Sequence, residues 1–168
     1  MVLDQLILMD LDGSFSMLTE KIKEHDQACN EMKQKTKIGH WTNEPNRVEF
    51  SHKGFDCLMV RNQFSLHWCG YMAVPKDHPW YERNYNDISV EVHGGLTYSN
   101  KCHDVVCHMP KVDGEDDVMW FGFDCAHSHD LSPTGSDPVA AKYKIYRDIT
   151  YVKNEIENLV QQAFDVRN

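Results

Sequence analysis

The chain has 168 residues, of which 41% are hydrophobic, so it can bury one core and is too apolar to be disordered throughout. It carries 26 acidic and 17 basic residues, a net charge of −9, which argues against a groove for long nucleic acid. No apolar run reaches the roughly 20 residues that span a bilayer, and the N-terminus lacks the pattern of a signal peptide. We therefore expect a cytoplasmic protein with no membrane partner.

The first 40 residues differ in pattern from the rest, and we expect them to form an N-terminal extension of a core domain at 41–168. Residues 6–9 are a short apolar run that predicts a strand. After them, one stripe of residues recurs at spacings of four and three, which predicts a helix of about five turns: Leu18, Ile22, His25, Cys29 and Met32.

The run LILMDLDGS resembles the opening of haloacid-dehalogenase-type phosphatases, in which a buried strand presents two aspartates to Mg²⁺ as nucleophile and general acid. Asp10 and Asp12 would take these roles. That resemblance implies further parallel strands alternating with helices, whereas the pattern after residue 40 is typical of hairpins. The alternative, which we prefer, is a short strand that ends in a capped turn before the first helix.

After Gly39, short alternating segments separated by turn residues predict strands at 48–51, 55–60, 67–74, 88–93 and 118–124. Prolines, glycines and polar residues predict loops at 75–87 and 131–138. Asp148 is the expected N-cap of a final helix with this apolar stripe: Ile149, Val152, Ile156, Leu159, Val160 and Ala163. The predicted class is α+β, a single domain with a mostly antiparallel sheet flanked by an N-terminal and a C-terminal helix.

The six cysteines are expected to be free and mostly buried, because a chain of this size needs no disulfides and nothing marks it for export. They are Cys29, Cys57, Cys69, Cys102, Cys107 and Cys125. The two Cys-His steps at 102–103 and 107–108 also raise the hypothesis of a structural zinc site, although they lack the C-x-x-C spacing of zinc ribbons.

Polar side chains concentrate in residues 91–95 and 124–130. Asp124, His127 and Asp130 are three apart, so one helical turn would bring them to one side, where a carboxylate can fix an imidazole tautomer. His93 ends the predicted strand 88–93, and Gly94-Gly95 permits another group to approach closely. We expect the two segments to meet, with four candidate catalytic residues: His93, Asp124, His127 and Asp130. The alternative is that the aspartates cap turns and His127 fills a polar gap.

A planar ligand would suit the many aromatic residues, three of which lie in the 75–87 loop, although such rings also serve to pack a loop onto a sheet. Gly122 would leave room beside Asp124 for that ligand or for another backbone. Arg61, Arg83 and Arg147 are candidates for binding phosphate or carboxylate. The predicted ligand-binding residues are His93, Tyr98, Trp120, Asp124, His127 and Arg147. The sequence does not identify a metal, and Zn²⁺ and Mg²⁺ are the two candidates.

The motifs HGGLTY and FGFDCAHSHD, together with EPNRVEF, CGYMAVPKDHPWY and YRDITYVKNEIENL, resemble a family of small uncharacterised proteins from phages and bacteria. The family has Asp-x-His-Gly-Gly where this chain has Glu91-Val92-His93-Gly94-Gly95. Its Cys-Ala-His-x-x-Asp pattern is met by Cys125, Ala126, His127 and Asp130. The resemblance spans about residues 41–160, and it implies a viral or bacterial origin and a ligand pocket without an established activity.

Three functions follow as hypotheses. The first is a phage accessory protein that sequesters a small nucleotide-like ligand, such as a host defence signal, in the host cytoplasm. The second is a metal- or His/Asp-dependent hydrolase of a small phosphorylated or nucleotide substrate. The third is a protein inhibitor of a host enzyme that acts through the acidic surface. The oligomeric state stays open, and the first two hypotheses depend on His93 and His127 lying together.

Overall fold

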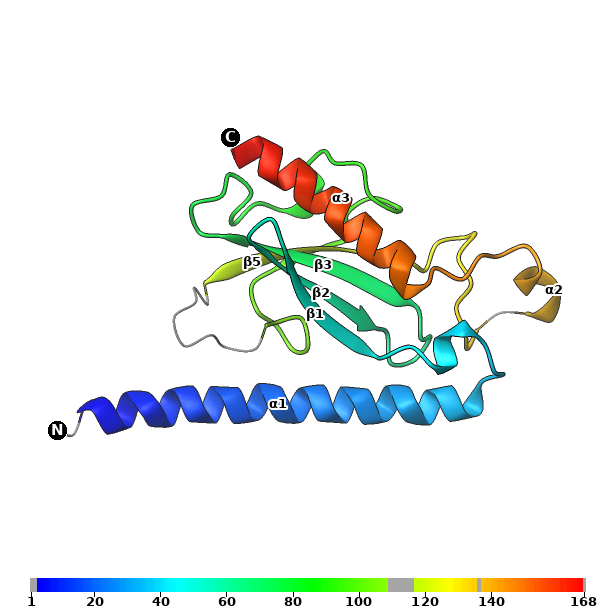
Figure 1. The fold of residues 1–168 in the computed structure, drawn as a ribbon, viewed down its shortest axis with the longest axis horizontal. Helices are drawn as coiled ribbons and strands as arrows, with labels where there is room; N and C mark the ends of the chain where they lie inside the picture. Colours follow the sequence, from blue (N-terminus) through cyan, green and yellow to red (C-terminus); the bar gives the residue numbers. More distant parts are fainter. Residues whose placement is uncertain (1–2, 109–116, 136, 168) are drawn as a thin grey trace.

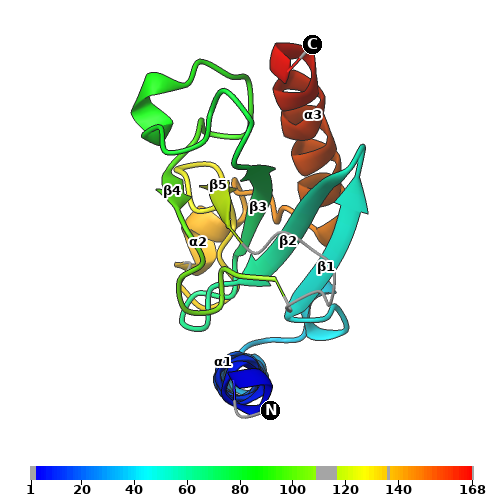
Figure 2. The ribbon, with the colours of Figure 1, turned by 90° about the vertical axis from the view of Figure 1, so that its left-hand side faces the viewer.

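The computed structural model describes residues 3–108, 117–135 and 137–167, with side chains from Met17 onward. Its helices are α1 (Leu3–Lys35), α2 (Pro138–Ala141) and α3 (Ile149–Arg167), and two single 3-10 turns lie at η1 (His40–Thr42) and η2 (Tyr85–Asp87). The strands are β1 (Arg47–His52), β2 (Phe55–Arg61), β3 (Trp68–Pro75), β4 (Tyr98–Asn100) and β5 (Val118–Asp124). They form one antiparallel sheet in the order β1-β2-β3-β5-β4 (Figures 1 and 2), which confirms the predicted α+β class.

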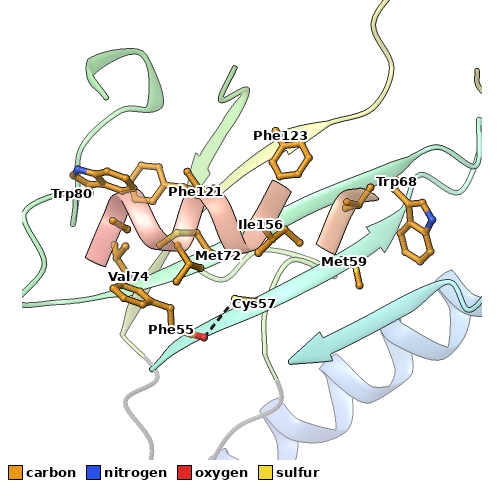
Figure 3. Packing of buried hydrophobic residues seen from close by; sticks show 14 of the residues in the cluster. Phe55, Cys57, Met59, Trp68, Met72, Val74, Trp80, Phe121, Phe123 and Ile156 are labelled. Carbon is orange, nitrogen blue, oxygen red and sulfur yellow. Dashed lines mark hydrogen bonds between the residues drawn. The ribbon is translucent and has the colours of Figure 1, made fainter. Parts of the chain in front are cut away.

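Helix α3 covers one face of the sheet and supplies five of the fifteen buried residues of the core on that side (Figures 1 and 3). Met72, Phe121 and Phe123, on β3 and β5, belong to the same buried cluster as Ile156 of α3. The predicted stripe of α3 is buried from Val152 to Ala163. The amide of Tyr151 donates to Asp148 Oδ1 at 2.8 Å, so Asp148 caps the helix as predicted.

A second, smaller cluster lies on the opposite face of the sheet, around Trp120 of β5. The loop at 102–107 packs there through Val105 and Val106 and is closed by a disulfide between Cys102 and Cys107, whose Cα atoms are 4.6 Å apart. Residues 103–106 form a local hairpin turn, because the amide and carbonyl groups of residues 103 and 106 bond each other. This turn brings the flanking cysteines together, a local geometry that the spacing argument did not consider.

The prediction of free thiols is therefore wrong for Cys102 and Cys107. It is confirmed for the other four, of which Cys69 is the one that is not fully buried: Cys29, Cys57, Cys69 and Cys125. The zinc hypothesis for the two Cys-His steps is wrong as well, because the sulfur atoms are bonded to each other and are not available as thiolate ligands.

One continuous helix, α1, replaces the strand and turn predicted near the N-terminus. The first proline is Pro45, and the single Gly13 costs a helix only about 1 kcal/mol, so nothing in this segment stops the helix. Asp10 and Asp12 lie within α1 rather than at the end of a strand. The phosphatase interpretation is therefore wrong, since it also needs a parallel sheet and every strand pair described is antiparallel.

The second half of α1 is attached to the domain by its predicted stripe. His25 and Cys29 are buried, and His25 Nε2 donates to Arg61 O at 2.8 Å. The Asn46 amide donates to Asp26 Oδ1 at 2.7 Å. Figures 1 and 2 show α1 on the opposite side of the sheet from α3. Within the described ranges, no helix has both the length and the apolar character needed to cross a membrane.

Residues 88–92 form no regular element and His93 begins a turn, so the strand predicted over 88–93 is wrong. Their backbone is bonded by side chains of α3 instead. Gln162 accepts from Glu91 N and donates to Glu91 O, both at 2.8 Å, and Glu155 accepts from His93 N at 2.8 Å. Apolar and polar residues nevertheless alternate along this segment, because Ile88, Val90 and Val92 pack against the core. Polar side chains of a helix thus take the place of a neighbouring strand.

A partly buried carboxylate, that of Glu44, fixes the start of α3. Its Oε1 accepts from Ile149 N at 3.1 Å, where the helix dipole favours negative charge. Its Oε2 accepts from Trp68 Nε1 at 3.1 Å, from Tyr146 OH at 2.5 Å, and from the buried Arg61. These bonds join the segment before β1, the sheet and the beginning of α3, and they hold the backbone of the residues that enter the site described next.

Candidate functional site

The two polar segments singled out in the sequence meet beside the first turns of α3. The rings of His93 and His127 are edge to face, with centroids 5.3 Å apart. Along the chain, His93 precedes β4 and His127 follows β5. The prediction that the segments carrying His93 and His127 lie together is therefore confirmed. His93, His127 and Asp130 each offer a ligand atom, and these atoms all lie within 4.8 Å of one another.

Asp130 is the centre of the site, and its side chain is 1% exposed. Its Oδ1 accepts from Arg147 Nε at 2.9 Å. Its Oδ2 accepts from His93 Nε2 at 2.7 Å and from the His127 amide at 3.0 Å. Burial alone would raise the pKa of this carboxyl, but the bonds from Arg147 and His93 outweigh burial and hold the pKa below the ordinary value of 3.8. Asp130 is thus an anion held in a fixed orientation.

Both nitrogens of His93 have partners. Nε2 faces Asp130, and Nδ1 lies 2.8 Å from the hydroxyl of Tyr151 on α3. A hydroxyl can donate or accept, so Tyr151 is compatible with either neutral tautomer of the imidazole. The ring is packed at an angle against Phe123, and its side chain is only 11% exposed. His93 is therefore oriented on both sides and is largely closed to solvent.

His127 differs from His93 in that its Nδ1 has no hydrogen-bond partner among the described residues. Its Nδ1 is buried, lies 3.4 Å from Asp130 Oδ2, and makes no hydrogen bond in the described part of the chain. The side chain as a whole is 37% exposed, the most open of the three. Gly94, at φ +66°, lies directly against the ring, and a Cβ there would be 2.0 Å from His127 Cε1. The close approach predicted for Gly94-Gly95 is thus made by His127.

Asp124 does not join this group. It accepts from Thr97 Oγ1 at 2.9 Å and from the Ala126 amide at 3.1 Å, so it caps the turn after β5, as the alternative interpretation held. The empty volume predicted beside it is filled, because the Tyr71 ring covers Gly122 and a Cβ there would lie 2.2 Å from Tyr71 Cδ1. The expectation of a ligand space next to Gly122 is wrong for this physical reason.

The two predicted aromatic ligand contacts lie elsewhere. Tyr98 and Trp120 belong to the cluster on the sheet face opposite α3, where Tyr98 OH and Trp120 Nε1 are buried without a hydrogen-bond partner in the part of the chain described. The rings of the 75–87 loop also pack inward, since Trp80 is buried in the main core and Tyr81 and Tyr85 pack against it. The loop therefore follows the packing interpretation rather than the stacking one.

Of the three candidate arginines, only Arg147 reaches the site. Arg61 is buried with Glu44, and Arg83 donates to Asp87 O at 2.7 Å. Arg147 uses Nε for Asp130, and its guanidinium lies over the Tyr151 ring at 4.6 Å. The bond to Asp130 raises the pKa of Arg147.

Sequence reasoning missed two residues of the site, Tyr151 and Glu155. Both lie on the first turns of the predicted final helix, whereas Arg147 precedes its cap, so helical spacing does not relate Arg147 to Tyr151. Nothing in the sequence links Glu155 to the backbone of His93, because that bond joins residues 62 positions apart.

Comparison with known proteins gives no relative from which a function could be transferred. A scan against models of protein families finds no match, and searches of curated proteins and of solved structures find no similar protein. The family resemblance drawn from the motifs therefore stays a prediction.

Proposed function

We propose that the protein is a hydrolase of a small phosphorylated or nucleotide substrate, and that the His93–His127–Asp130 cluster activates the attacking water. One observation carries the proposal: two imidazoles meet at a buried carboxylate that is oriented by an arginine, with one imidazole open to solvent. Imidazole and carboxylate groups in hydrogen-bond contact are the usual means of activating water.

Arg147 supports the choice of an anionic substrate. Its Nε is held by Asp130 and its plane by Tyr151, so the guanidinium is pre-oriented with its side chain 22% exposed. The terminal nitrogens can then meet a phosphoryl oxygen. In the reaction, the water oxygen bonds to phosphorus, the bond from phosphorus to the leaving oxygen breaks, and the leaving oxygen takes up a proton.

Sequestration without cleavage has less support. That hypothesis drew on aromatic rings free to stack on a base, whereas Trp80 and Trp120 are both buried in core clusters. The exposed imidazole beside a fixed carboxylate suits a reaction better than it suits passive binding of a base. Sequestration is therefore the competing outcome of the experiment below.

The test incubates the protein with p-nitrophenyl phosphate, bis(p-nitrophenyl) phosphate, nucleoside triphosphates and cyclic dinucleotides, then denatures it and identifies the released compounds by mass spectrometry. We expect cleavage of at least one compound, and a loss of at least about 100-fold in rate for His127→Ala, in line with general acid–base contributions. His129→Ala is the matched control, because His129 is exposed in the same turn and lies outside the cluster. Recovery of every bound compound intact would overturn the proposal in favour of sequestration.

A further inference from the structure

We propose that the cluster is a zinc-type metal centre, with His93 Nε2, His127 Nδ1 and Asp130 Oδ2 as its three ligands. The inference deepens the proposed function, on which its catalytic consequence rests, because it names the group that activates water.

Two of the three distances between ligand atoms are near those around a small tetrahedral ion, and all three ligand atoms lie within 4.8 Å of one another. Zinc binds imidazole nitrogen and carboxylate oxygen at about 2.0–2.2 Å, which separates neighbouring ligands by about 3.3 Å in a tetrahedron. His127 Nδ1 and Asp130 Oδ2 are 3.4 Å apart, already at that spacing. His93 Nε2 and Asp130 Oδ2 are 2.7 Å apart and would separate by about 0.6 Å on binding. A small shift of one ring therefore converts the hydrogen-bonded pair into two ligands.

The polar atom without a partner points to the same place. His127 Nδ1 is buried and makes no hydrogen bond to any described residue, although a buried ring nitrogen normally has a partner. A metal ion between His127 Nδ1 and Asp130 Oδ2 would supply the missing partner. A closed set of protein hydrogen bonds, in contrast, explains His93 but leaves His127 Nδ1 unexplained.

The groups around the ligands are those that orient metal ligands in proteins. Tyr151 OH holds the far nitrogen of His93 at 2.8 Å, and Arg147 holds the far oxygen of Asp130 at 2.9 Å. The backbone of both histidines is also fixed, His93 N by Glu155 and His127 N by Asp130. Such outer contacts set the ring orientation and the tautomer of the ligating histidine.

The ligand set selects among metals. Two imidazoles and one carboxylate favour Zn²⁺ over Mg²⁺, which prefers an octahedral shell of oxygen atoms. Three protein ligands leave a fourth position for water, the arrangement of catalytic zinc sites, and the partial exposure of His127 provides access to it. The choice between Zn²⁺ and Mg²⁺, which the sequence left open, is thereby narrowed to Zn²⁺.

The experiment is a calorimetric titration of chelator-treated protein with Zn²⁺ alone, with Mg²⁺ alone as the second arm. We expect one tight Zn²⁺ site and no Mg²⁺ binding. Zn²⁺ affinity should fall at least 100-fold in His127→Ala and 10- to 100-fold in Tyr151→Phe, which removes only an orienting hydroxyl. His129→Ala should bind Zn²⁺ like the wild type, and thermal unfolding of each variant reports whether it is folded.

A second measurement does not depend on any variant. Wild-type protein loaded with Co²⁺ should show the intense visible absorption of a tetrahedral site with nitrogen and oxygen ligands. Unchanged Zn²⁺ affinity in folded His127→Ala, or an octahedral Co²⁺ spectrum, would overturn the inference. Zn²⁺ binding without cleavage of any substrate would remove the proposed function and leave the metal site. Substrate cleavage that continues after treatment with chelator would overturn the metal-centre inference and leave the proposed hydrolase function.

Discussion

At the scale of single residues, the most informative contact in the site is that of Gly94 with His127. Gly94 and Gly95 both have positive φ, at +66° and +81°, but only Gly94 has a neighbour within 4 Å of the place where a Cβ would lie. Two adjacent glycines thus have the same backbone requirement and different surroundings. This difference separates the effect of backbone strain from the effect of displacing an imidazole.

Gly94→Ala and Gly95→Ala should each cost about 1 kcal/mol of unfolding free energy, because alanine is strained at positive φ. Only Gly94→Ala should also weaken Zn²⁺ binding and turnover, by at least about tenfold, since its Cβ would push the His127 ring away from Asp130. Urea denaturation measures the first effect, and calorimetry with the substrate assay measures the second. Equal losses of Zn²⁺ affinity in the two variants would contradict this role of Gly94.

At the scale of elements, the segment 88–93 shows how far an alternating pattern can be trusted. The pattern correctly indicated that Ile88, Val90 and Val92 face the core, but it cannot tell what bonds the backbone. Here the partners are three side chains of α3, the carboxylate of Glu155 and the amides of Asn158 and Gln162. No local signal distinguishes these from ordinary solvent-facing residues. Pattern also misled at the N-terminus, where a four-residue apolar run predicted a strand. The segment contains no residue that stops a helix, and it forms part of α1.

The elements that were predicted well share a strong local signal. The stripe of α3, its cap at Asp148 and the strand β5 each follow from periodicity and capping chemistry alone. The site was predicted in part for the same reason, since His93, His127 and Asp130 stand next to glycines and turns. Asp124 was assigned to it by spacing, and spacing cannot show that its carboxylate turns toward Thr97 instead.

Gln162→Ala tests whether α3 holds the segment 88–93 as a strand would. The change removes the two bonds from Gln162 to the Glu91 backbone, including the acceptor of the Glu91 amide, and leaves Asn158 donating to Glu91 O at 3.0 Å. Amide hydrogen exchange at Glu91 should therefore become at least about tenfold faster. Global stability should fall by about 1 kcal/mol, since these bonds are exposed to water. Gln161→Ala is the control on the same helix, because Gln161 bonds Asp165 and Lys53 rather than this segment. Unchanged exchange at Glu91 would show that core packing alone holds the segment.

At the scale of the whole molecule, His78 links the loop after β3 to the last turns of α3. Its Nδ1 accepts from Trp80 N at 3.0 Å, and its Nε2 donates to Ala163 O at 2.9 Å. An amide can only donate and a carbonyl can only accept, so these two bonds fix the neutral Nε2–H tautomer. Burial lowers the pKa of His78 below its ordinary value of 6.5, opposed by the bond to Ala163 and reinforced by Arg167.

This pKa makes the stability of the fold depend on pH in a defined direction. Below about pH 6.5, His78 is protonated in the unfolded chain but stays neutral in the folded protein. The free energy of unfolding should therefore fall, through this group, by up to about 1.4 kcal/mol for each unit by which the pH is lowered. Urea denaturation with chelator present, at pH 7.5 and 5.5, should show a smaller loss for His78→Gln, which keeps a donor for Ala163 O but does not titrate. The acid sensitivity that remains in the variant includes that of His67, whose pKa burial also lowers. Parallel losses in wild type and variant would show that His78 does not couple the loop and α3 to pH.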